Sequence, residues 1–166
     1  MGRGFVRIMV PLVAAVMLMG CATGISKEVR SQVTYSGSFG ELQQNPEKFT
    51  GQTVMFGGKI IESQILAQGP ELTVLQIELD DGDRPLSDDQ SKGRFLIHSK
   101  QFIDPAVYPP GTLITVVGTL EASQERLIGQ MNYRYPVVNA IEIKKWPPPA
   151  DNSPRIHFGI GVGTVF

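Results

Sequence analysis

The stretch TVMFGGKIIESQI at residues 53–65 decides the fold class of this chain. It is rich in β-branched and aromatic residues, which are typical of strands, and Gly57 and Gly58 interrupt it in the middle. Two glycines inside a strand indicate a bulge or a tight bend. A long first strand with such a bend suits a small barrel, because that strand must serve both of its sheets.

Five further runs with strand character follow, at residues 72–79, 94–98, 113–120, 126–131 and 136–143. The turn formers Gly69 and Pro70 precede the first of them and predict a hairpin. Ser38 and Glu41 have capping-box spacing and predict one short N-terminal helix. Because no crossover helices separate the strands, we expect an all-β fold with an antiparallel OB-like barrel at residues 38–146. A β-sandwich is the alternative.

Length, composition and charge exclude several classes of protein. A chain of 166 residues suffices for one domain, and 42% hydrophobic with 19% charged residues is not the composition of a disordered chain. The 15 basic and 16 acidic side chains give a net charge of −1, which offers no electrostatic footprint for nucleic acid or anionic lipid. We therefore expect no nucleic-acid partner.

Residues 1–20 have the architecture of a signal peptide. Arg3 and Arg7 precede an apolar run at residues 8–19, and this run is shorter than the roughly 20 residues that a membrane-spanning helix needs. The run ends in Leu18, Met19, Gly20 and Cys21, and Cys21 is the only cysteine of the chain. This ending resembles a bacterial lipobox, in which the cysteine receives lipid.

Lipidation of Cys21 would place the chain on a membrane. We expect a diacylglyceryl group on the thiol, cleavage before Cys21 and acylation of the new amino group, and several acyl chains together hold a protein on a bilayer stably. An incidental Cys21 in an ordinary secretory peptide is the alternative. In lipoproteins that resemble this one, an aspartate after the cysteine signals inner-membrane retention, so Ala22 favours the outer membrane. The lipid on Cys21 is the one non-protein group expected, with no other cofactor.

The two flanks of the barrel have different compositions. Residues 21–37 are polar and weakly periodic, and we expect a tether between lipid and domain. Residues 147–166 begin as a Pro-rich linker and end in alternating glycine and apolar residues at 158–166. This tail would pair with a sheet edge of another envelope protein or rest against lipid. The plainer alternative is a disordered end or a strand that folds back on the barrel.

Few residues offer catalytic or metal chemistry. His98 and His157 are the only histidines, and neither has an evident partner along the sequence. No serine stands in a G-x-S-x-G pattern. The acidic group comprises Asp80, Asp81, Asp83, Asp88 and Asp89 and lacks the ligand spacing of a calcium loop. We therefore expect no catalytic residue and no metal site.

Three aromatic residues form the candidate binding face. Tyr133, Tyr135 and Trp146 follow one another near one end of the predicted domain. Their rings could stack on a sugar or pack against a peptide. Completing the core is the alternative role.

Several short motifs follow one another in a characteristic order. They are NPEKFTGQTV at 45–54, FGGKII at 56–61, GRF at 93–95, TVVG at 115–118, IG at 128–129, YPVV at 135–138 and KKW at 144–146. Together with the lipobox they resemble the Slp family of starvation-inducible outer-membrane lipoproteins. The resemblance implies an outer-membrane lipoprotein connected with starvation or stationary phase, and it brings no catalytic residues.

The sequence thus predicts a non-catalytic structural or interaction module that is held on the outer membrane by lipid and faces the periplasm. The alternative is a periplasm-facing binding module for an envelope glycan or peptide. A fold alone does not choose between these roles.

Overall fold

The computed structural model describes residues 24–86 and 90–148. It contains two short helices, α2 (Lys27–Arg30) and α3 (Phe39–Gln44), and the 3-10 helix η1 (Pro46–Phe49). The strands are β1 (Thr53–Leu66), β2 (Gly69–Ile77), β3 (Arg94–His98), β4 (Leu113–Ile128) and β5 (Met131–Lys145). Within the described ranges, no helix has the length and apolar character needed to cross a bilayer.

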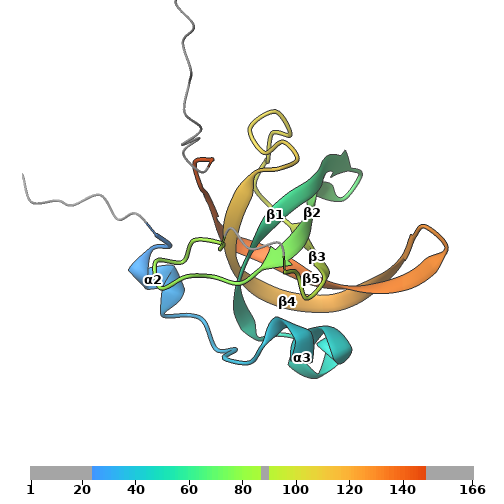
Figure 1. The fold of residues 1–166 in the computed structure, drawn as a ribbon, viewed down its shortest axis with the longest axis horizontal. Coiled ribbons are helices and arrows are strands. Elements are labelled where there is room, and N and C mark those ends of the chain that lie inside the picture. The colour runs from blue at the N-terminus through green and yellow to red at the C-terminus, as the bar shows by residue number, and fades with distance from the viewer. Residues whose placement is uncertain (1–23, 87–89, 149–166) are drawn as a thin grey trace, which may run out of the picture.

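The strands close into a barrel in the order β1-β2-β3-β5-β4 (Figure 1). Neighbouring strands are antiparallel except β3 and β5, which run parallel. A small five-stranded barrel of this kind is OB-like. The predicted fold class is therefore confirmed, and the β-sandwich alternative is wrong.

The strand count differs from the expected one, because residues 126–131 do not form a strand of their own. These residues comprise the end of β4, a tight turn and the start of β5. The pairing of β4 with β5 continues up to the turn, where Ile128 pairs with Met131. Gly129 occupies the turn with a φ of +62°, a conformation that favours glycine. The paired residues 124–135 thus extend β4 and β5 beyond the barrel as a hairpin, here called the β4–β5 arm (Figure 1).

The two glycines of β1 allow a close approach of the neighbouring strands. Gly57 and Gly58 pair with β2 on one side and with β4 on the other. A Cβ on Gly58 would collide with the backbone of Leu75. The bulge predicted at these glycines lies farther along, where the register shifts between Ile60 and Glu62.

Helix α3 closes one end of the barrel. Its cap forms as predicted, since the Ser38 hydroxyl accepts a hydrogen bond from the Glu41 N–H at 3.2 Å. Phe39 then packs edge-to-face on Phe56, with 5.2 Å between the ring centroids, and it also contacts Phe95 at 5.8 Å. These rings belong to the main core, which fills the barrel interior.

The segment before α3 is docked on the barrel, unlike the expected tether. Ile25 is buried, and Ser26 donates from its N–H and its hydroxyl to the Glu142 carboxylate at 3.1 and 2.6 Å. Arg30 of α2 forms an ion pair with the buried Asp83. A free tether would leave these groups in solvent, so the tether prediction is wrong for residues 24–37. Residues 21–23 lie outside the described ranges.

Candidate functional site

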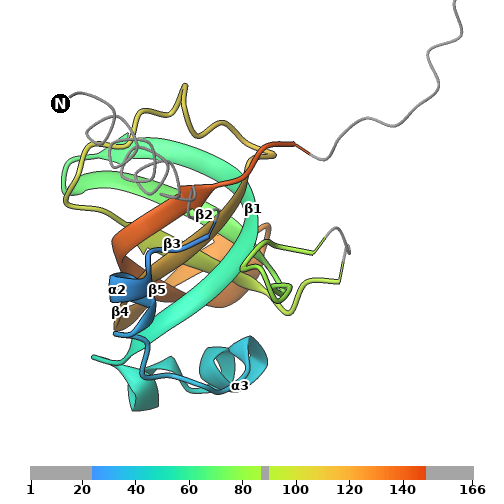
Figure 2. The ribbon, with the colours of Figure 1, turned by 90° about the vertical axis from the view of Figure 1, so that its left-hand side faces the viewer.

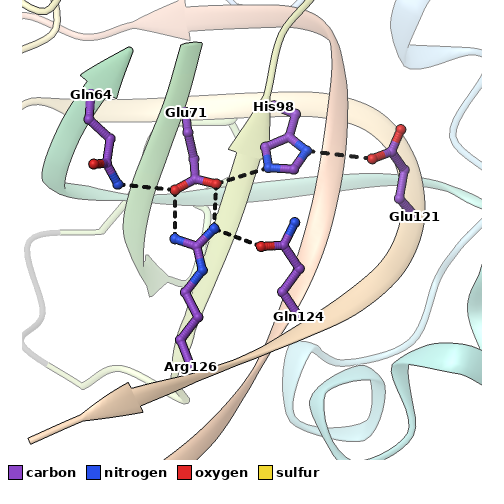
Figure 3. Close-up of polar contacts among 6 residues, drawn as sticks. All are labelled: Gln64, Glu71, His98, Glu121, Gln124 and Arg126. Atoms are coloured by element: carbon purple, nitrogen blue, oxygen red, sulfur yellow. Dashed lines mark hydrogen bonds and ion pairs between the residues drawn. The ribbon is translucent and has the colours of Figure 1, made fainter. Parts of the chain in front are cut away.

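A buried carboxylate on the outside of the barrel wall is the centre of the main polar cluster (Figure 3). Leu72 and Val74 of β2 belong to the core in the barrel interior, so Glu71 points outward by strand alternation. Glu71 is nevertheless only 1% exposed. Glu71 and the side chains that surround it, which come from three other strands, are named here the Glu71 network. Its members are Gln64, Glu71, His98, Glu121, Gln124 and Arg126.

The strongest contact of the network joins the β4–β5 arm to β2. Arg126 donates from Nη1 and Nη2 to the two carboxylate oxygens of Glu71, each at 2.6 Å. Arg126 Nη2 also donates to Gln124 Oε1 at 2.6 Å, and Gln64 Nε2 donates to Glu71 Oε1 at 3.2 Å. Such a two-pronged pair between guanidinium and carboxylate is among the strong hydrogen-bonded arrangements in proteins.

His98 connects the network to a second carboxylate. Its Nε2 lies 3.0 Å from Glu71 Oε2, and its Nδ1 lies 3.6 Å from Glu121 Oε2. Asn139 Nδ2 donates to the other oxygen of Glu121 at 2.9 Å. Strand register aligns these side chains, because Glu71 is paired with His98 and His98 with Asn139. His98, which has no evident partner along the sequence, therefore has two carboxylate partners in the structure.

The surroundings of Glu71 favour its ionised form. Burial by itself would raise the pKa of the Glu71 carboxyl, but hydrogen bonds from Arg126 and His98 outweigh burial and hold the pKa below its usual value. The same hydrogen bonds, which Arg126 donates to Glu71, raise the pKa of Arg126. Glu71 is therefore a carboxylate near neutral pH and acts only as an acceptor.

The arrangement suits a structural clamp better than acid–base chemistry. Both oxygens of Glu71 already accept hydrogen bonds, and the side chain is buried. A general base needs a free lone pair within reach of a substrate proton, which this geometry does not provide. No three His, Cys, Asp or Glu side chains form a metal-binding group within residues 24–86 and 90–148.

Two of the three predicted binding aromatics are in contact with each other. The rings of Tyr133 and Tyr135 are 4.7 Å apart, and Tyr135 is buried against Leu96 in a second, smaller core outside the barrel wall. Tyr133 Oη accepts a hydrogen bond from the Arg94 N–H at 2.6 Å and contacts the Gln43 amide. The two tyrosines therefore pack the β4–β5 arm, in agreement with the alternative role in which these aromatic residues complete a core.

Trp146 lies apart from the two tyrosines. Its backbone N–H donates to the Leu113 carbonyl at the start of β4, whereas the tyrosines pair near the far end of β4. Its indole N–H donates to Thr115 Oγ1 at 2.9 Å, and Arg84 and Lys144 each approach the ring to 5.8 Å. The three aromatics do not form one face.

A groove of about 870 Å³ lies beside Trp146. Its lining is largely apolar and comes from the loop before β4 and from the end of β5, including Val107, Pro110 and Pro148. Lys145 adds a charge at its wall. Of the three predicted binding aromatics, Trp146 is the one that lines this groove.

Several predicted site residues lie outside the described ranges. They are Leu18, Met19, Gly20 and Cys21 of the lipobox, His157, Asp88, Asp89 and the tail at 158–166. The acidic group is thus described only in part, and Asp83 within it is buried and paired with Arg30 rather than solvated.

Sequence reasoning missed Glu71, Arg126 and Glu121 as partners of His98. Each of the three is an ordinary polar residue in or beside a strand run, and no short motif joins them. The one available signal is alternation, since a polar residue on the outward face of an otherwise apolar strand needs either solvent or a partner. Alternation does not identify the partner.

Comparison with known proteins gives a consistent set of relatives. Residues 18–160 match the family model described as the outer membrane lipoprotein Slp family. The uncharacterized lipoprotein YeaY of Escherichia coli is 30% identical over 132 residues, which cover 80% of this chain and 68% of that protein. The outer membrane protein Slp of Escherichia coli is 28% identical over 134 residues, covering 78% of this chain and 69% of that protein.

Among solved structures, a small single-stranded DNA-binding protein from Streptomyces coelicolor is similar to this chain with a TM-score of 0.37. The match covers 57% of this chain and 94% of that one, at 13% identity. A similarity this low carries no ligand over to the present chain.

Proposed function

Because the chain belongs to the Slp family of outer membrane lipoproteins, we propose that it is a non-catalytic interaction module which lipid on Cys21 holds on the periplasmic side of the outer membrane. The family makes it an envelope lipoprotein. The Glu71 network supports the absence of catalysis. Its carboxylate is buried and its oxygens are occupied by Arg126 and His98, so this cluster of charged side chains serves packing.

The lipobox supports the attachment. Leu18, Met19 and Gly20 precede the sole cysteine, and Ala22 after it favours sorting to the outer membrane.

We further propose that synthesis rises in starvation or stationary phase, as the resemblance to the family implies. Immunoblots through a growth curve test this, and a constant level per cell would contradict it.

Metabolic labelling with a fatty acid tests the attachment. Cys21→Ala should abolish label incorporation and leave the chain unprocessed or unanchored, because the thiol that accepts the lipid is gone. Gly20→Ala is the matched control, since a small residue still precedes Cys21 and labelling should persist. Equal labelling of Cys21→Ala and the wild type would refute lipidation.

The partner proposed for this module is an envelope protein that pairs with the tail at 158–166. Alternating glycine and apolar residues support this proposal, because such a segment can add to a sheet edge. Deleting residues 154–166 should leave the barrel as stable as before and remove neighbours captured by crosslinking in intact cells. A large loss of thermal stability would instead make the tail part of the fold.

A second candidate function is the binding of an envelope glycan or peptide. The groove beside Trp146 favours it, because an indole ring with nearby cations is a common recognition surface. Titration of the purified protein with cell-wall fragments tests it. Saturable binding that Trp146→Ala abolishes would support this function, and absence of binding would leave the first proposal.

A further inference from the structure

The docked N-terminal segment begins very close to the proposed lipid attachment. Gly24 lies against the Asp83 loop, where an added Cβ would come within 3.0 Å of the Asp83 carboxylate. Three peptide units separate Cys21 from Gly24, and a chain of that length spans at most about 11 Å when fully extended. Acyl chains on Cys21 would therefore hold the surface around Gly24 near the lipid headgroups.

A chain of contacts connects this attachment point to Trp146. Asp83 pairs with Arg30, and the Asp83 carbonyl accepts a hydrogen bond from Thr115 Oγ1 at 2.5 Å. Thr115 Oγ1 in turn accepts from the Trp146 indole N–H at 2.9 Å. Thr115 is fully buried beneath these groups. Trp146 is thus part of the same surface as the docked N-terminal segment.

Two basic side chains lie beside the Trp146 ring on this surface, and a third is on α2. Arg84 and Lys144 flank the Trp146 ring at 5.8 Å each, and Lys27 is exposed on α2. Of the nearby carboxylates, Asp83 is balanced by its ion pair with Arg30. Glu142 accepts from Ser26, and Asp80 accepts from the Gly82 and Arg84 N–H groups, and both keep their charge. Among the described residues of α2 and the Asp83 loop, Glu28, Asp80 and Asp81 are exposed acids.

We infer that this surface, here called the membrane face, lies on the phospholipid headgroups. It comprises Gly24, Lys27, Arg84, Lys144 and Trp146. Tryptophan is enriched at the membrane–water interface, and lysine and arginine are attracted to anionic headgroups. The inference rests on the proposed lipidation and adds an orientation to it, since acyl chains on a long free tether would leave the barrel able to turn in any direction.

The orientation places the β4–β5 arm away from the bilayer. Figure 1 shows α2 and the tip of the arm at opposite ends of the longest axis, and Figure 2 shows α2 and the docked segment on the face turned toward the viewer. Leu127 and Met131 are 65% and 73% exposed near the tip of the arm. In this orientation, these apolar side chains face the aqueous space and not the lipid.

The single tryptophan of the chain makes the orientation measurable. The acylated protein is reconstituted into vesicles of phosphatidylethanolamine and phosphatidylglycerol, with and without a phosphatidylcholine brominated near the headgroup end of its chains. Bromine quenches tryptophan only at short range, so Trp146 should lose much of its fluorescence. A matched variant, here called the arm-tip variant, carries Trp146→Phe together with Leu127→Trp, and its fluorescence should be unaffected by bromine.

Charge reversal tests the role of the cations. Each basic residue near an anionic surface contributes roughly a fivefold factor to binding, so Arg84→Glu with Lys144→Glu should reduce the quenching of Trp146. Arg134→Glu is the control, because Arg134 is an exposed cation that pairs with Glu125 on the arm. It should leave the quenching unchanged.

The outcomes separate this inference from the proposed function. Mass spectrometry first shows whether Cys21 is acylated, and an unmodified Cys21 would overturn both. If Cys21 is acylated, quenching of the arm-tip variant without quenching of the wild type would overturn the orientation alone. A second outcome would also overturn the orientation. If bromine does not quench Trp146 and its emission instead shifts when soluble cell-wall fragments are added, the groove beside Trp146 binds a ligand.

Discussion

The carboxylate of Glu71 on β2 accepts hydrogen bonds from both terminal nitrogens of Arg126, which lies 55 residues later on the β4–β5 arm. The pair fastens the arm to the outside of the barrel. Glu71 is 1% exposed and the Arg126 side chain 33%, so the contact lies at the boundary between protein and solvent. The free energy it contributes is therefore intermediate between that of a buried pair and that of a surface pair.

The substitution Glu71→Gln should destabilise the fold. It keeps the shape of the side chain but removes the negative charge and replaces one of the two acceptor oxygens with an NH2 donor, which faces the donors of Arg126 or His98. Removing one partner of a fully buried ion pair costs about 3–5 kcal/mol, and the partial exposure of Arg126 lowers our expectation to about 2 kcal/mol. Urea unfolding followed by circular dichroism measures the change.

Glu125→Gln is the control for this substitution. The Glu125 side chain is 64% exposed and pairs with Arg134 at 3.1 Å. Its loss should change the free energy of unfolding by less than about 0.5 kcal/mol. Equal effects of the two substitutions would contradict the clamp.

Acid should weaken the fold through the same carboxylate. The pKa of Glu71 is held below its ordinary value of 4.5, so the unfolded chain binds more protons than the folded chain in the window below that value. The contribution of the Glu71 carboxylate to the free energy of unfolding is fully present above pH 4.5, and it is lost as the pH falls through the lower pKa of the folded state. The urea midpoint of the wild type should therefore fall more steeply in this window than that of Glu71→Gln. Parallel curves for the two proteins would show that Glu71 is not linked to acid stability.

Gly118→Ala should destabilise the barrel where β4 and β5 meet. A Cβ at this position would collide with the Asn139 carbonyl and come within 2.7 Å of the Val138 side chain. Because the carbonyl belongs to the backbone of a paired strand, it cannot move away without distorting the sheet. We expect a loss of about 1–3 kcal/mol in the free energy of unfolding.

Gly40→Ala serves as its counterpart in helix α3. The nearest atom to an added Cβ there is Lys92 Cδ at 4.0 Å, an ordinary contact. Alanine also favours a helix over glycine by about 0.5–1 kcal/mol. This variant should be as stable as the wild type or more so, and a loss comparable to that of Gly118→Ala would contradict the packing described.

Tyr133→Phe should loosen the arm without changing its apolar packing. The ring contact with Tyr135 remains, but the Arg94 N–H loses its acceptor at 2.6 Å and the Gln43 amide loses a partner. Leaving such a donor unpaired costs about 1–2 kcal/mol. Faster hydrogen exchange at the Arg94 amide would report the change locally.

Tyr108→Phe is the control for the hydroxyl. The Tyr108 ring contacts the Lys145 ammonium at 5.8 Å, and that contact survives removal of the oxygen. Little change in stability is expected. If Tyr133→Phe also left the stability unchanged, the hydrogen bond from the Arg94 N–H would contribute nothing to the stability of the arm.

The strand positions were largely readable from short stretches of sequence. The run predicted at residues 94–98 coincides with β3, Arg94–His98, and the capping box at Ser38 begins α3. These signals are local, because strand alternation and helix capping depend on residues within a few positions of each other. The turn at Gly129 was missed, since residues on both sides of it have equal strand character.

The Glu71 network and the docked segment at Ile25 could not be predicted from short stretches of sequence. Glu71 meets His98 through the β2–β3 register, and it meets Arg126 only because the arm extends beyond the barrel. Likewise, Ile25 is buried between Gly24 and Ser26, which contact the distant residues Asp83 and Glu142. Nothing in the polar sequence around it predicts this docking.

The amino-acid sequence by itself determined most of the strands and the helix cap, and it predicts the lipobox at its single cysteine, because each depends on neighbouring residues. Only the tertiary structure decided which polar side chains meet, that Trp146 lies apart from Tyr133 and Tyr135, and that the chain is docked three residues after Cys21. The physical reason is closure of the barrel. It fixes the register of five strands at once and brings together side chains that no local pattern relates.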